Sequence, residues 1–152
     1  MQKFFKLIVA LLIPQIIGGI GAIFTVSAIP SWYSTLNKPF LNPPNYIFGP
    51  VWTILYLMMG ISFFLIWQKG FAKKTGGFFM IQLFLNGIWS FLFFGLQSPL
   101  LALIDIILLI IFLALTIFYF FQNNRLASFL LIPYFLWITF ASYLNLMIYI
   151  LN

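Results

Sequence analysis

Five apolar runs of about 20 or more residues, separated by short polar or proline-containing segments, constrain this chain more than any other feature. A run of this length spans the hydrocarbon layer of a bilayer as a helix, whereas the core helices of soluble domains are shorter. Composition agrees, because 64% of the residues are hydrophobic, 5% are charged and the mean hydropathy is +1.16. Such a chain cannot cover itself with a water-soluble surface. We therefore predict an all-α integral membrane protein.

The runs predict a five-transmembrane-helix bundle that occupies residues 1–152 as a single domain, with a proline-rich lid loop between the first two helices. The expected spans are 4–29, 48–68, 76–96, 99–121 and 127–151. Because the breaks are short, consecutive helices should be antiparallel neighbours. The first run also resembles a secretory signal that ends at Val26-Ser-Ala28, but its length favours a retained first helix.

An odd number of spans places the two termini on opposite sides of the membrane and sorts the cations. Lys38 lies alone on one side, and the other side carries Lys3, Lys6, Lys69, Lys73, Lys74 and Arg125. By the positive-inside rule the side with six cations is cytoplasmic. We expect a cytoplasmic N-terminus, with the first loop and the C-terminus outside. The cations form no basic patch, so binding to nucleic acid is not expected.

The inventory of reactive side chains is very small. The chain has no Cys, no His and one acidic residue, Asp105. Disulfides, a metal site and ordinary nucleophilic or acid–base catalysis are therefore not expected, and neither is a resident cofactor.

Polar, aromatic and small residues recur at helical spacing within the apolar runs, where residues four positions apart share one face of a helix. Such faces are Trp52, Tyr56 and Gly60 in the second span, Gln82, Asn86 and Ser90 in the third, and Trp137, Ala141 and Asn145 in the fifth. The first span carries a stripe of Pro14, Gly18, Gly21 and Thr25, where a neighbouring backbone can approach closely.

At a rise of about 1.5 Å per residue, several of these side chains reach one level near the first loop. They are Thr25, Trp52, Tyr56, Ser90, Asp105 and Asn145. Polar groups in hydrocarbon are costly, so these residues either hydrogen-bond the helices together or line a pocket that opens toward the loop. Asp105 should be protonated or paired, and Lys38 is the one cation on its side.

The first loop, 30–46, is too rich in proline to be helical throughout and carries several aromatic residues. Trp32, Tyr33, Phe40 and Tyr46 form either an interfacial aromatic belt or a lid over the pocket.

One set of residues resembles a known family in both order and spacing. The set is Trp32-Tyr33, Leu36, Lys38-Pro39, Pro43-Pro44, Trp52, Leu55-Tyr56, Gly60, Gln82, Leu85-Asn86, Trp89-Ser90, Asp105, Pro133-Tyr134, Trp137, Phe140-Ala141 and Leu144-Asn145. On these residues the chain resembles the TspO/MBR family, which includes the tryptophan-rich sensory proteins of bacteria and the mitochondrial translocator protein, or peripheral benzodiazepine receptor.

The resemblance implies a homodimeric five-helix bundle in the plasma membrane of a bacterium. It also implies a cavity for porphyrins such as protoporphyrin IX and for isoquinoline-carboxamide-type ligands. By positional match the cavity residues are Tyr33, Trp52, Asn86, Trp137 and Ala141. With the residues found by spacing, the expected ligand-binding set is Trp32, Tyr33, Lys38, Trp52, Tyr56, Asn86, Ser90, Asp105, Trp137, Ala141 and Asn145.

The chain departs from the family's pattern at three places. The segment after Asn145 lacks the Arg that ends the cholesterol-recognition pattern of animal members, which argues against cholesterol binding. Phe40 stands where many members have a second lid tryptophan. Gly87 and Gly95 are separated by Phe91, which leaves a small-residue dimer face incomplete.

Three functions fit this sequence. The first is a receptor or carrier that binds porphyrin in tetrapyrrole handling and stress response. The second is light-dependent degradation of porphyrin, for which the resemblance implicates Trp52 and Trp137. The third is a structural or regulatory membrane partner with a vestigial cavity.

Overall fold

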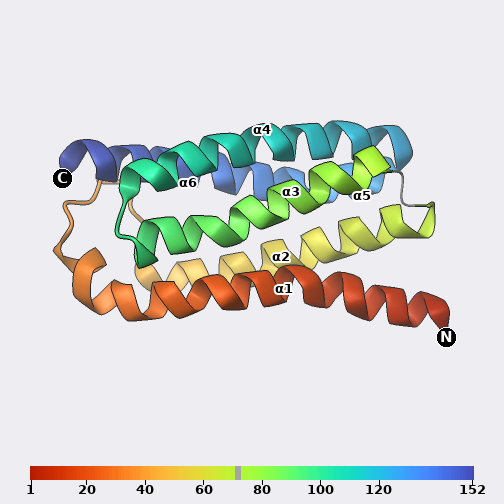
Figure 1. Ribbon diagram of the computed structural model, residues 1–152, viewed down its shortest axis with the longest axis horizontal. Coiled ribbons are helices and arrows are strands. Elements are labelled where there is room, and N and C mark those ends of the chain that lie inside the picture. The colour runs from red at the N-terminus through yellow and green to blue at the C-terminus, as the bar shows by residue number, and fades with distance from the viewer. Residues whose placement is uncertain (71–72) are drawn as a thin grey trace.

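The length of the apolar helices determines the architecture, and the predicted five-helix membrane bundle is confirmed. The computed structural model describes residues 1–70 and 73–152, in which five helical segments are long and apolar enough to cross a membrane (Figure 1). The elements are α1 Gln2–Ala28 with its π-helical extension η1 Ile29–Tyr33, α2 Asn45–Gln68, α3 Lys73–Ser90 with its π-helical extension η2 Phe91–Gly95, α4 Pro99–Asn123, α5 Arg125–Leu130 and α6 Ile132–Leu151. The two termini lie at opposite ends of the bundle.

Prolines account for the main differences from the predicted bounds. The predicted fifth span, 127–151, is divided into α5 and α6 at Leu131. The cause is Pro133, which cannot donate a helical hydrogen bond and whose ring clashes with a carbonyl of the preceding turn. The first span continues beyond Pro30 as the wider π-helical turn η1, which ends at Tyr33. The predicted break 69–75 includes residues 71 and 72, so it lies partly outside the described residues, as does the side chain of Lys73.

A single residue separates α4 from α5. Asn124 adopts an extended conformation, and its Oδ1 accepts hydrogen bonds from Leu126 N at 3.1 Å and Ala127 N at 3.4 Å. This N-cap satisfies backbone donors that the first turn of α5 would otherwise leave unpaired. The chain can therefore reverse within the membrane boundary at little cost.

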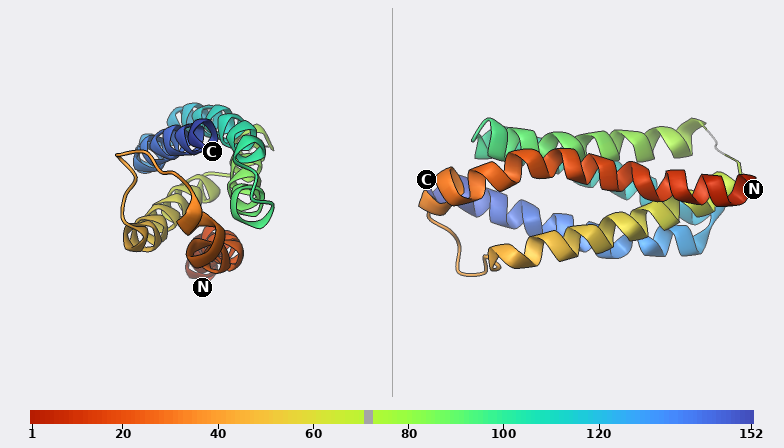
Figure 2. Two further views of the ribbon diagram at one scale, coloured as in Figure 1. Left: turned by 90° about the vertical axis from the view of Figure 1, so that its left-hand side faces the viewer. Right: turned by 90° about the horizontal axis from the view of Figure 1, so that it is seen from below.

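The apolar core fills the end of the bundle away from the first loop. Phe79 stacks on Phe63 with ring centroids 4.6 Å apart and lies 5.8 Å from the ring of Phe120, so that α2, α3 and α4 meet there. Around this core α1 packs on α2 and α3, and α4 packs on α3 and α6 (Figure 2, left). The opposite end, which carries residues 34–44 and is named the loop end below, is less filled and contains the cavity described next.

Close contact between α1 and α2 depends on Gly60. A Cβ atom at Gly60 would lie 2.7 Å from Ala10 O and 2.8 Å from Leu11 Cα, both of which are backbone atoms that cannot move aside. Gly18 faces the Tyr56 ring and Gly21 faces Ser90, so the stripe of small residues in the first span does admit its neighbours closely.

Candidate functional site

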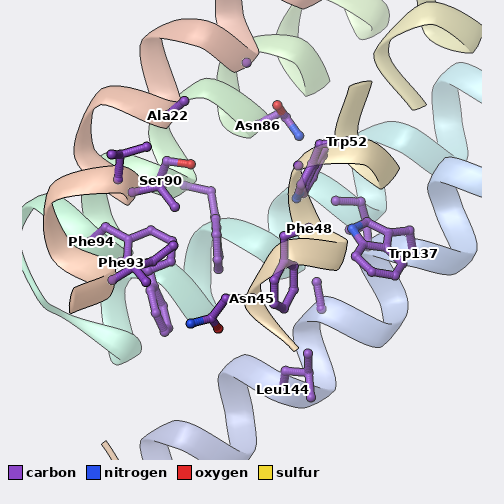
Figure 3. Close-up of a pocket in the computed structure, with 18 of the residues that line it drawn as sticks. Ala22, Asn45, Phe48, Trp52, Asn86, Ser90, Phe93, Phe94, Trp137 and Leu144 are labelled. Carbon is purple, nitrogen blue, oxygen red and sulfur yellow. The ribbon is translucent and has the colours of Figure 1, made fainter. Parts of the chain in front are cut away.

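A cavity of about 550 Å³ lies between the helices at the loop end. Its volume is within the range of small-molecule sites, which is roughly 300–1,000 Å³. Helices α1, α2, α3, α4 and α6 all contribute wall residues. Figure 3 shows Phe48, Trp52 and Trp137 across the cavity from Ser90, Phe93 and Phe94. The wall is mostly apolar and aromatic, and it suits a flat hydrophobic molecule.

Three hydrogen-bonding side chains from three helices close the inner end of the cavity. Tyr56 Oη donates to Asn86 Oδ1 at 2.7 Å, and Asn86 Nδ2 donates to Tyr134 Oη at 2.8 Å. The ring of Trp52 stacks on Tyr56 at 5.3 Å and contacts Tyr134 edge-on at 6.2 Å. All three members of the chain are buried, so each bond stabilises the contacts among α2, α3 and α6.

A second polar chain supports the wall formed by α3 and α6. Trp89 Nε1 donates to Asn145 Oδ1 at 3.1 Å, and Asn145 Nδ2 donates to Pro99 O at the start of α4 at 2.8 Å. Asn145 therefore holds three helices together while it lines the cavity. Asn86 and Asn145 thus fit both interpretations that spacing left open, as helix-linking residues and as wall residues.

The indole N–H of Trp137 is different from these satisfied groups. Its Nε1 is buried and has no hydrogen-bond partner among the described residues. Trp137 lines the cavity and contacts Phe48 edge-on at 6.1 Å, and Figure 3 shows its nitrogen on the side that faces Phe48 and Trp52. A buried donor without an acceptor is costly, so this one is available to an acceptor atom on a ligand.

The aromatic residues of the first loop divide into two groups. Trp32 and Tyr33 pack inward on Phe93, and Tyr33 lines the cavity. Phe40 is 101% exposed and lies outside the cavity wall, whereas Tyr46, in the first turn of α2, is 78% exposed and lines the cavity. The choice between a lid and an interfacial belt stays a prediction.

Comparison with known proteins decides the family. The model of the TspO/MBR family matches residues 10–151. The chain belongs to the TspO/MBR family. It is 47% identical to the tryptophan-rich protein TspO of Archaeoglobus fulgidus over 149 residues, which cover 97% of each chain. It is 35% identical to the tryptophan-rich sensory protein of Cereibacter sphaeroides, over 82% of this chain and 81% of the relative. It is also 37% identical to the translocator protein of Bos taurus, over 88% of this chain and 82% of the relative.

Eight of the eleven residues predicted to bind a ligand line the cavity of this TspO/MBR protein. They are Tyr33, Trp52, Tyr56, Asn86, Ser90, Trp137, Ala141 and Asn145. They come together because helical spacing places them on the inner faces of their spans, and these faces meet at the loop end. Their contact with a ligand stays a prediction.

The other three predicted residues lie outside the cavity wall. Trp32 faces a smaller hollow beside Leu36 and Tyr149. The ammonium of Lys38 lies over the Tyr33 ring, 4.7 Å from its centroid, and Lys38 Nζ donates to Leu36 O at 3.4 Å. Asp105 is buried beside the wall residue Ile106, and its Oδ2 has no hydrogen-bond partner among the described residues. Lys38 and Asp105 form no ion pair within the described part of the chain.

Two wall features were absent from the sequence-based predictions. Phe48 and the α1 face that contains Gln15, Gly19 and Ala22 both line the cavity. Gln15 could have been noticed, because it is the one amide side chain inside the first apolar run. No group of three His, Cys, Asp or Glu side chains in the described residues is placed to hold a metal ion.

Proposed function

We propose that this TspO/MBR protein is a membrane receptor or carrier that binds protoporphyrin IX and other planar hydrophobic ligands in its bundle cavity. Such a protein would act in tetrapyrrole handling and stress response. The names of two relatives, translocator protein and tryptophan-rich sensory protein, fit carriage or sensing. Isoquinoline-carboxamide-type ligands, which are also flat, should compete for the same space.

The observation that carries this proposal is the unpartnered Trp137 N–H in an aromatic wall. A flat macrocycle can lie against Trp52 and Phe93, and a carbonyl, carboxylate or ring nitrogen on its edge can accept from Trp137. Asn86 and Asn145 already use their amides between helices, so Trp137 is the natural group to orient a ligand.

The test is a titration of purified protein with protoporphyrin IX, followed by the absorption band of the pigment. Trp137→Phe keeps an aromatic ring and removes the N–H, so affinity should fall by about three- to tenfold. Trp67→Phe is the matched control, because Trp67 lies at the other end of α2, where it contacts Lys6. Equal dissociation constants for Trp137→Phe and the wild type would refute the assigned role of Trp137, and absence of binding to the wild type would refute the function.

A second candidate function is light-dependent degradation of the bound porphyrin. It is supported by the position of Trp52 and Trp137, two oxidisable rings in the wall of one cavity. Under illumination in air, the pigment should bleach faster with the wild type than with Trp52→Phe. Equal bleaching rates at equal occupancy would argue against it.

We also propose a homodimer in the plasma membrane of a bacterium, with a cytoplasmic N-terminus. The helix ends away from the loop end carry Lys3, Lys6, Lys69 and Arg125. Lys38 lies at the loop end. That asymmetry supports the orientation by the positive-inside rule.

A further inference from the structure

The cavity is bounded on one side by two helices that separate toward the loop end. Helices α1 and α2 are in contact at Gly60, next to Ala10 and Leu11. From there they diverge, as Figure 2 (right) shows. Both Gly19 and Gly49 line the cavity, yet a Cβ atom built on either would meet no atom within 4 Å. The two helices therefore leave open space between them at this level.

This space reaches the surface of the bundle. Gly19, Ala22, Gly49 and Thr53 line the cavity and are also exposed. Val26, a further wall residue, is 71% exposed. A wall built from exposed residues is an opening, and here it lies between two helices that are long and apolar enough to cross a membrane.

A hydrogen bond between the two helices marks the inner limit of the opening. Gln15 Nε2 donates to Thr53 O at 3.1 Å, and Gln15 lines the cavity. Gln15 is about 20 Å along α1 from Gln2, at a rise of about 1.5 Å per residue, which is deep in the hydrocarbon layer. An amide side chain at that depth costs free energy unless it forms a hydrogen bond. Here it joins the helices just before they separate.

Hydrogen bonds tie the first loop to the bundle at the loop end. Asn37 N donates to Asn152 Oδ1 at 2.9 Å, and Asn152 Nδ2 donates to Asn37 O at 3.1 Å, which pins the first loop to the end of α6. Within the loop, Tyr33 Oη donates to Asn42 Oδ1 at 3.0 Å. Displacing the first loop would break these contacts.

We propose that the cavity exchanges its ligand with the bilayer through the opening bounded by Gln15, Gly19, Ala22, Gly49 and Thr53, the α1–α2 window. The ligands that it admits are flat molecules that dissolve in the acyl-chain layer. This inference rests on the proposed function, because it names the route to that same cavity. The first loop stays pinned during exchange.

The test narrows the window without disturbing the packing. Gly19→Phe/Gly49→Phe places two rings at its edges, where the added Cβ atoms have free space. With protein in phosphatidylcholine vesicles and protoporphyrin IX supplied from other vesicles, the association and dissociation rates should both fall, by about tenfold. Gly77→Phe is the matched control, since Gly77 is a helical glycine with equally free surroundings outside the cavity. Wild-type rates in the double variant, or a change in the dissociation rate alone, would overturn the proposal.

Two further arms separate the route from the function. Asn37→Ala/Asn152→Ala releases the loop and should leave both rates unchanged; faster exchange in this variant would place the route at the loop. In ligand-free protein, lipids brominated along their acyl chains should quench tryptophan emission more in the wild type than in Gly19→Phe/Gly49→Phe. Equal quenching in the two proteins would overturn the window, whether or not protoporphyrin IX binds. If protoporphyrin IX does not bind but the quenching differs, the result counts against the proposed function and not against the window.

Discussion

At the scale of single residues, Asn86 both links helices and lines the cavity. It accepts from Tyr56 and donates to Tyr134, so one amide joins α2, α3 and α6. It is also 4% exposed and lines the inner end of the cavity. Because Tyr56, Asn86 and Tyr134 are all buried, the three side chains depend on one another for their hydrogen bonds.

Asn86→Leu should destabilise the protein by about 1–3 kcal/mol, because it leaves two buried tyrosine hydroxyls without their partner. Unfolding in mixed micelles with increasing dodecyl sulfate measures this loss. Asn123→Ala is the control, since Asn123 is exposed and, among the described residues, its side chain bonds only within its own helix. If Asn86→Leu is as stable as the wild type, the network does not hold the helices together.

At the scale of helices, the contact at Gly60 determines how α1 and α2 diverge. The backbone of α1 occupies the space that any side chain at Gly60 would need. Toward the loop end the same helices are joined by the Gln15–Thr53 hydrogen bond and then separate around the cavity. The close contact at Gly60 and the α1–α2 window therefore both follow from the way α1 packs against α2.

Gly60→Ala should destabilise the bundle by about 1–3 kcal/mol through overpacking against α1. Gly77→Ala should instead stabilise it by about 0.5–1 kcal/mol, because alanine favours the helix and its Cβ meets nothing at that site. Thermal unfolding of the two variants in the same detergent measures both effects. Similar melting temperatures for the two would contradict the role assigned to the Gly60 contact.

The sequence predicts the positions of these helices along the chain well, and it predicts less well how they bend and pack against one another. Hydropathy and helical spacing are sufficient for the five spans and for the shared level of Trp52, Tyr56 and Ser90. The division at Leu131 depends on how one proline is accommodated, which hydropathy does not report. The sequence leaves Asp105 either protonated or paired, with Lys38 as the one cation on its side, and the structure places Lys38 on Tyr33. The window depends on the angle between two helices, which no local pattern specifies.

At the scale of the whole molecule, the bundle is asymmetric along its length. One end is filled by stacked phenylalanines, which include Phe63 and Phe79, and the other encloses a cavity of about 550 Å³. The described cations other than Lys38 belong to the filled end. Charge and packing therefore distinguish the same two ends.

Single cysteines can test the orientation, because the natural chain has none. We expect Phe40→Cys to react with a membrane-impermeant thiol reagent added to intact cells, since Phe40 is fully exposed at the loop end. Lys74→Cys should react only after the cells are opened. The opposite pattern of labelling would invert the proposed topology.

The most direct measurement of the central claim is thermal unfolding of the wild type with increasing protoporphyrin IX. A ligand that binds only the folded bundle stabilises it by about 2.7 kcal/mol at 100 times its dissociation constant, so the melting temperature should rise with concentration. Ala141→Trp, which places an indole ring inside the cavity, should abolish this rise, whereas Ala114→Trp on the exposed face of α4 should keep it. A melting temperature that does not change with protoporphyrin IX, or an equal rise in both variants, would contradict a ligand site within the bundle.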